Sequence, residues 1–229
     1  MELCFQRIHS TSRFDNAQHR LCQLPKGHDG NHDEFPYLRY LQRTNPTVSA
    51  KIKRDATMTT GAAWKSDDAG PNRILRWMMT LSDEELLNYD VNMAALSEQV
   101  VAKLREKAAD YDACMRVARK LTWLVYQMPG APSSPEPVQM YLEGFYGRIN
   151  SHSTCCLVCR LPLKFDLFAN ARRGKADVET AHSNPRVHDD TNVGFAHRAC
   201  NIAQGAKTLS EFYTWIRDIL DRVDASHNS

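Results

Sequence analysis

The sequence predicts an α+β protein, and three observations lead to this class. Residues 73–128 carry apolar side chains at helical spacing over most of their length. Residues 151–229 contain a segment that reads as a β-hairpin and is followed by helices. Cysteine and histidine pairs flank that segment, which indicates a small C-terminal unit held together by a metal ion.

The composition is that of an ordinary soluble globular protein. Of the 229 residues, 42% are hydrophobic and 24% are charged, with a formal net charge of +2. No apolar run approaches the roughly 20 residues that span a bilayer, and the first residues lack the pattern of a secretory signal. We therefore expect a cytoplasmic protein without a membrane partner. The net charge alone does not indicate a nucleic-acid ligand.

Seven cysteines are present, and most of them lie near histidines in the sequence. Disulfides rarely persist in a reducing cytoplasm, so this arrangement favours metal ligands. Residues 1–40 contain one such set, Cys4, Cys22, His28 and His32. These residue types suit tetrahedral zinc, which predicts a small zinc-binding segment. A polar irregular loop with surface histidines is the alternative.

Residues 41–72 show no apolar period and are expected to form a linker or loop. Lys51, Lys53 and Arg54 form a basic cluster there that could touch phosphates, although solvated linker charges are the simpler interpretation. Residues 73–128 are expected to form a helical scaffold, as one long helix or as two helices joined near Asp110. Ser82-x-x-Glu85 is a capping box within it.

A Pro-rich linker over 129–137 is the clearest domain boundary in the chain. In the domain that follows, residues 138–229, a short helix over 138–149 comes first. We expect hairpin strands near 163–168 and 176–181, joined by a basic loop. A last helix begins at the capping box Thr208-x-x-Glu211.

The strongest motif is a pair of knuckles in this domain. Cys156-x2-Cys159 and His197-x2-Cys200 together supply the four ligands of a structural zinc. We call these four residues the zinc clamp. Cys155 stands beside Cys156 and leaves a second register open.

The same region resembles the HNH endonuclease superfamily. The features that carry the resemblance are the C-x2-C knuckle, a hairpin ending at His182 shortly before Pro185, and the run NVGFAHRACNIAQG over 192–205. The ending Cys200-Asn201 is similar to the H-N-N branch, in which asparagine replaces the last histidine. The resemblance covers about 151–215 and implies a ββα-metal finger with a structural zinc and a metal-dependent DNA endonuclease activity.

The resemblance also implies roles for single residues. His182 falls on the general base that takes a proton from water, and Asn201 falls on a ligand for Mg²⁺ or Mn²⁺. Asn192 falls on the middle asparagine, which holds the loop and the histidine in place.

One position departs from the family pattern. The family usually has aspartate or histidine directly before the base as a metal ligand, and Ala181 stands there. Glu179, two residues earlier on the same strand face, could reach the ion. Alternatively, Asp189 or His188 could fold back from the loop, or Ala181 replaces a native aspartate and inactivates the protein.

Basic side chains are concentrated around this motif. They are expected to contact DNA phosphates, although acidic neighbours also permit ordinary surface charge. The candidates are Arg172, Arg173, Lys175, Arg186, Arg198 and Lys207.

The sequence therefore predicts a metal-dependent endonuclease acting on double-stranded DNA, of a site-specific restriction or phage type. Its cofactors would be one or two structural Zn²⁺ ions and a catalytic Mg²⁺ or Mn²⁺. A junction nuclease selective for DNA structure and a non-catalytic DNA-binding protein held together by zinc are the alternatives. The helical scaffold leaves a homodimer open.

Overall fold

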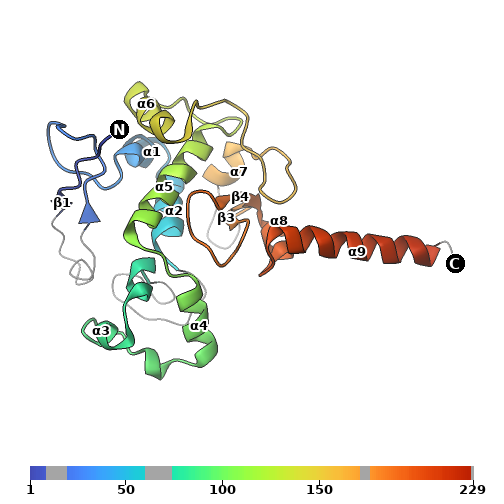
Figure 1. The fold of residues 1–229 in the computed structure, drawn as a ribbon. Coiled ribbons are helices and arrows are strands. Elements are labelled where there is room, and N and C mark those ends of the chain that lie inside the picture. The colour runs from blue at the N-terminus through green and yellow to red at the C-terminus, as the bar shows by residue number, and fades with distance from the viewer. Residues whose placement is uncertain (9–19, 60–73, 171–175, 228–229) are drawn as a thin grey trace.

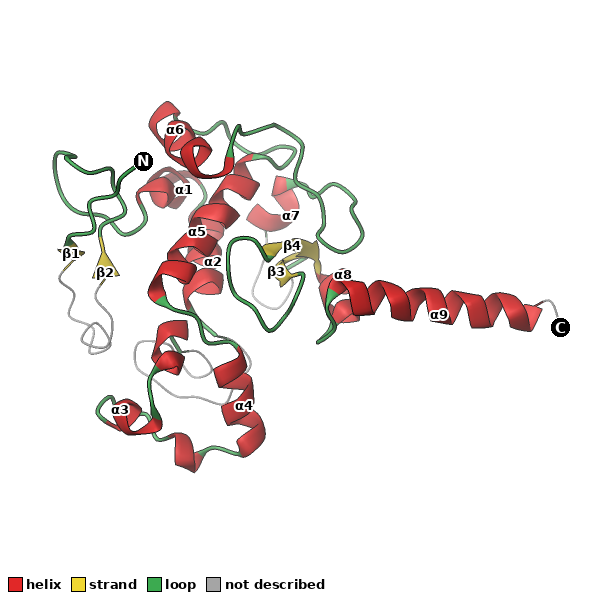
Figure 2. Ribbon diagram, in the orientation of Figure 1, coloured by secondary structure: helices red, strands yellow, loops and turns green. Residues whose placement is uncertain are grey.

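The structure, a computed structural model, describes residues 1–8, 20–59, 74–170 and 176–227. Helices dominate, and two small antiparallel sheets of two strands each complete the described part, which confirms the α+β class (Figure 2). Among the described residues, no helix combines the length and apolar character needed to cross a membrane.

Helix α5 (Tyr111–Tyr126) is the spine of the molecule and stands beside α2 in Figure 1. Asp110 caps it, since its carboxylate accepts a hydrogen bond of 2.6 Å from the backbone of Ala113. Helix α4 (Glu98–Glu106) ends before this cap, so the helical block is divided near Asp110, one of the two expected arrangements.

Two apolar clusters meet on α5. Its first turn, with Tyr111 and Cys114, packs on the short elements η3 (Arg76–Thr80), α3 (Asp83–Leu87) and η4 (Met93–Ala95) and on α4. From Val117 onward, the helix belongs to a larger core that includes the C-terminal sheet. The expected capping box at Ser82 begins α3.

The prediction of a linker or loop over 41–72 is wrong for residues 41–57, which are mostly helical. Helices α1 (Arg39–Thr44) and α2 (Pro46–Thr57) occupy this range, and α2 packs against α5. Val48, Ile52 and Ala56 are fully buried and lie four residues apart on one face of α2. This stripe is one residue wide and charged residues interrupt it, so the sequence shows no apolar period.

The N-terminal segment folds around a short antiparallel pair, β1 (Arg7–Ile8) and β2 (Arg20–Leu21). The 3₁₀ helix η2 (Pro36–Leu38) leads from it into α1. The Tyr141 hydroxyl donates a 2.8 Å hydrogen bond to the Gln23 carbonyl, and so connects this segment to α6 (Glu136–Tyr146).

The Pro-rich segment 129–137 runs along one continuous core. That core includes residues of α2 and α5 before it, and residues of α6 and of the C-terminal sheet after it. The backbone of Phe165 also donates a hydrogen bond of 2.9 Å to the Pro129 carbonyl. In this structure, the segment joins parts that pack on each other.

The hairpin differs from the expected one. The first strand was expected near 163–168, but most of that range lies in helix α7 (Phe165–Ala169). Phe165 and Phe168 are both buried, and their spacing of three residues places them on one helix face. The sheet instead pairs β3 (Val178–His182) with β4 (Val193–His197), so that Ala181 lies opposite Gly194.

Helix α8 (Arg198–Gln204) follows β4 directly and packs on both strands. Helix α9 (Leu209–His227) begins at the expected cap, where the Glu211 carboxylate accepts hydrogen bonds from the backbone and hydroxyl of Thr208. Leu209 and Phe212 are buried, and the rest of α9 extends away from the body (Figure 1).

Candidate active site and metal centres

The four residues of the zinc clamp lie together at one end of the hairpin. Their ligand atoms are all within 4.8 Å of one another, and Cys159 Sγ lies 3.4 Å from His197 Nδ1. Cys156 is buried in the core, whereas Cys155 is exposed and lies outside the cluster, so the structure favours the Cys156 register. The set could hold a metal ion and would connect the 156–159 turn to the start of α8.

The N-terminal set forms a second group of the same kind. The ligand atoms of Cys4, Cys22, His28 and His32 also lie within 4.8 Å of one another. Cys22 Sγ is 3.4 Å from His28 Nε2, and Cys4 Sγ is 3.7 Å from His32 Nδ1. Pairing of the backbone around Cys4 and Cys22 places the two thiols side by side.

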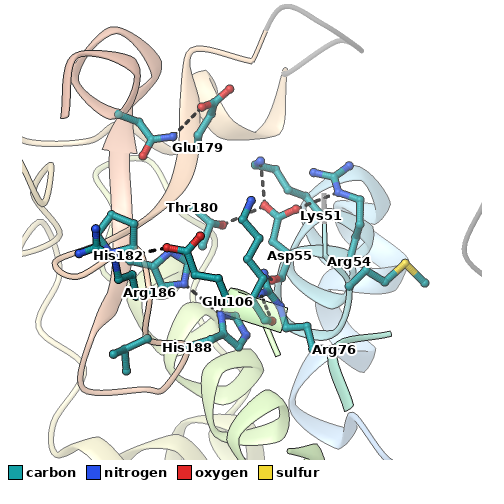
Figure 3. Close-up of a pocket in the computed structure, with 15 residues that line it drawn as sticks. Lys51, Arg54, Asp55, Arg76, Glu106, Glu179, Thr180, His182, Arg186 and His188 are labelled. Carbon is teal, nitrogen blue, oxygen red and sulfur yellow. Dashed lines mark hydrogen bonds and ion pairs between the residues drawn. The ribbon is translucent and has the colours of Figure 1, made fainter. Parts of the chain in front are cut away.

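A cleft of about 340 Å³ lies between the scaffold and the hairpin. Its walls come from α2, η3, α4, β3, the loop after β3 and α8 (Figure 3). Its charged and hydrogen-bonding lining residues are Lys51, Arg54, Asp55, Arg76, Glu106, Lys107, Glu179, Thr180, His182, Arg186, His188 and Asn201.

Glu179 and Asn201 meet at one side of this cleft. The amide Nδ2 of Asn201 donates a hydrogen bond of 2.9 Å to Glu179 Oε2, and Arg198 Nε lies 3.7 Å from the other carboxylate oxygen. A strand and a helix thus bring a carboxylate and an amide together. Oxygen donors of this type suit a hard divalent cation.

His182 is deeper in the cleft and contacts a second histidine. Its Nε2 lies 3.0 Å from His188 Nδ1, and His188 Nε2 lies 2.8 Å from the Ala56 carbonyl oxygen of α2. Burial, followed by the positive charges of Arg76 and Lys107, lowers the pKa of His182 to about 4. Burial likewise holds the pKa of His188 far below its usual value. Both rings are neutral at neutral pH.

The residues of the other two explanations are Ala181, Asp189 and His188, and of these three only His188 lines the cleft. Ala181 is 1% exposed, within the core, and does not line the cleft. The Asp189 carboxylate accepts hydrogen bonds from the backbone of Thr191 and Asn192, both at 2.9 Å, which form a turn. His188 is the partner of His182.

Asn192 holds the loop that joins β3 to β4. Its Oδ1 accepts from the backbone of Asn184 at 2.8 Å and from the Ser183 hydroxyl. Its Nδ2 donates to the carbonyls of Asn184 and Val187. The side chain thereby fixes the loop between His182 and His188.

The basic residues expected to contact DNA lie in different surroundings. Arg186 lines the cleft, Arg198 lies beside Glu179, and Lys207 stacks on the Trp215 ring with its Nζ 4.9 Å from the centroid. Arg172, Arg173 and Lys175 lie outside the described residues.

The contribution of α2 and η3 to the cleft was not predicted from the sequence. Lys51 and Arg54 bind the Asp55 carboxylate at 3.0 and 2.8 Å, and Asp55 also accepts a 2.9 Å hydrogen bond from the Thr180 hydroxyl of β3. Arg76 is buried beside them and donates to the backbone carbonyls of Asp55 and Lys107. The basic cluster at Lys51 and Arg54 could have indicated this contribution, but it lies in a segment that was expected to be a linker.

Comparisons with known proteins give a family and a similar solved structure. A crystal structure described as that of a type II restriction endonuclease superposes with a TM-score of 0.87 at 46% identity. The match covers 98% of this chain and 100% of that one. No curated protein matches the sequence. The model of the DraIII family matches residues 34–200, which is most of the chain and includes the hairpin, the zinc clamp and the cleft residues except Asn201. The chain therefore belongs to the DraIII family.

Proposed function

We propose that this chain is a site-specific, metal-dependent DNA endonuclease of the HNH (ββα-metal) type. It would hydrolyse phosphodiester bonds in double-stranded DNA. The observation that carries the proposal is the meeting of Glu179, His182 and Asn201 in one cleft with a basic wall. Membership of the DraIII family and the similarity to a type II restriction endonuclease support it.

In the proposed reaction, His182 acts as the general base. Because its ring is neutral, it can accept a proton from a water molecule in the cleft. The hydroxide attacks the phosphorus of the scissile phosphodiester. The bond to the 3′ oxygen breaks as the new P–O bond forms, and the leaving oxygen takes a proton from solvent.

Glu179 and Asn201 would hold the catalytic Mg²⁺ or Mn²⁺. The carboxylate and the amide oxygen form a hard donor set from two elements that are already in contact. When bound, such an ion would neutralise charge that develops on the phosphate. Glu179 would thus replace the ligand that Ala181 cannot supply.

The cations of both walls would hold the DNA backbone. Arg186 and Arg198 come from the hairpin side, and Lys51 and Arg54 come from α2. Each phosphate contact contributes to binding that weakens as salt is raised. The zinc clamp and the N-terminal set would each hold a structural Zn²⁺ and take no part in the chemistry.

Plasmid cleavage tests this proposal. Wild-type protein with Mg²⁺ or Mn²⁺ should give discrete fragments, and chelation of the ion should stop cleavage. His182→Ala and Asn201→Ala should reduce the rate at least 100-fold while DNA binding, measured by fluorescence anisotropy, is retained. His152→Ala is the matched control, because this exposed histidine does not line the cleft.

The same assays separate the alternatives. Cleavage of branched DNA alone would identify a junction nuclease. DNA binding without cleavage under any metal condition would identify a non-catalytic DNA-binding protein. The helical scaffold leaves a homodimer open, and sedimentation equilibrium of the full chain measures the oligomeric state.

A further inference from the structure

We infer that His188 is a positioning residue that fixes the tautomer and orientation of His182 through a backbone carbonyl of α2. The inference rests on the proposed role of His182 as the base. Three groups form a continuous chain: His182 Nε2, 3.0 Å from His188 Nδ1, and His188 Nε2, 2.8 Å from the Ala56 oxygen. The two ring centroids are 5.2 Å apart with planes tilted by 46°.

The proton positions follow from the end of this chain. The Ala56 carbonyl can only accept, so His188 Nε2 carries the hydrogen. A neutral imidazole has one N–H, so His188 Nδ1 is an acceptor. His182 Nε2 therefore donates to it, and His182 Nδ1 is the nitrogen that retains a lone pair. Only this nitrogen can take a proton from water.

The carbonyl that ends the chain is well suited to this role. Ala56 lies in the last turn of α2, where carbonyls lack a partner further along the helix. It is fully buried, and the adjacent Asp55 binds Thr180 of β3 at 2.9 Å. Asn192 holds the loop that carries His188. The Ala56 carbonyl and the His188 ring are therefore both held in place by contacts that do not involve His182.

This arrangement connects α2 directly to the proposed base. The base lies on β3, its partner lies on the following loop, and the final acceptor lies on α2, more than a hundred residues earlier in the chain. Figure 3 shows His182 and His188 close together, with Lys51, Arg54 and Asp55 of α2 across the cleft from them. A buried histidine that only fills space would have no effect on which nitrogen of His182 is protonated.

Three variants separate the positioning role from a merely structural one. His188→Gln can preserve the chain, because its amide N–H can donate to the Ala56 carbonyl while its oxygen accepts from His182. His188→Leu fills similar space and offers neither group. We expect kcat to fall about 100-fold in His188→Leu with KM for DNA unchanged, and to recover most of that loss in His188→Gln. His152→Ala should leave both constants unchanged.

The tautomer itself can be measured without any cleavage. In the full-length protein with ¹⁵N-labelled histidine, ring nitrogen shifts distinguish N–H from bare nitrogen, and loss of signals in His182→Ala assigns that ring. We expect His182 as the Nε2–H tautomer in wild type and His188→Gln, and a mixture in His188→Leu. Folding of each variant is checked by thermal melting, and His188→Gln remains informative if His188→Leu does not fold.

The outcomes are distinct from those for the proposed function. The inference would be overturned if His182 of the wild type were the Nδ1–H tautomer, or if His188→Leu and His188→Gln lost kcat equally. In either case, an inactive His182→Ala variant would leave the proposed function intact. A His182→Ala variant that still cleaves DNA would overturn the proposed function itself.

Discussion

At the scale of single residues, Ala181 occupies the position where the family pattern leads one to expect a metal ligand. Its side chain is 1% exposed, and a Cβ added to its cross-strand partner Gly194 would meet the Leu157 side chain at 3.4 Å. Ala181 is therefore part of the apolar core. A carboxylate there would be buried without a partner, which is costly.

We predict that Ala181→Asp destabilises the protein by about 3 kcal/mol or more at neutral pH, without a gain in cleavage. Chemical denaturation measures the stability, and Ala181→Asn is the neutral control of the same shape. Burial should raise the pKa of the new carboxyl above its unfolded value. Its destabilisation, relative to Ala181→Asn, should therefore fade as pH falls toward 4 and the group becomes protonated. If Ala181→Asp is stable and cleaves faster with Mn²⁺, the prediction is wrong, and position 181 is one where a metal ligand is missing.

At the scale of elements, local signals were predictable and long-range ones were not. The helix starts at Ser82 and Thr208 are set by side chains three residues away, so the sequence alone reveals them. The pairing of β3 with β4 depends on residues across a loop of ten, and the residues of α7 are apolar enough to read as a strand. The clamp residues were found because two knuckles with correct spacing are a strong chemical signal.

The zinc clamp predicts a measurable difference between two adjacent cysteines. Metal analysis of the full chain should give two zinc ions, one for each Cys/His set. Cys156→Ala should remove one ion and lower the melting temperature, because bound zinc contributes free energy on the order of 10 kcal/mol to small sites. Cys155→Ala should retain both ions, because Cys155 is exposed and outside the cluster. If Cys155→Ala loses a zinc ion and Cys156→Ala keeps both, Cys155 is the ligand in place of Cys156.

At the scale of the whole molecule, the cleft belongs to no single sequence segment. Its catalytic candidates come from the C-terminal region, whereas Lys51 and Asp55 come from α2 and Arg76 comes from η3. The sequence could indicate each residue type, but it could not show that α2 packs beside β3, because this contact depends on tertiary packing. The Asp55–Thr180 hydrogen bond is the clearest sign of that contact.

The shared core leads to a prediction about residues 138–229, the domain that the Pro-rich segment was expected to delimit. Phe168, Phe195 and Ala196 of this region are almost fully buried, in the same core as Val117 and Leu121 of α5. Without α2 and α5, this apolar surface would face water, and His188 would lose its acceptor. We therefore expect the isolated 138–229 fragment to bind one zinc ion yet to lack a cooperative thermal transition and DNA cleavage.

The full chain is the reference for this experiment, and the two pieces 1–137 and 138–229 mixed together are its control. Recovery of near-UV circular dichroism and of cleavage on mixing would locate the deficit in the missing core. A fragment that melts cooperatively near the temperature of the full chain and cuts DNA would contradict the prediction. It would show that the hairpin, α8 and the zinc clamp form an independent domain and that the scaffold serves another purpose, such as recognition of the target site.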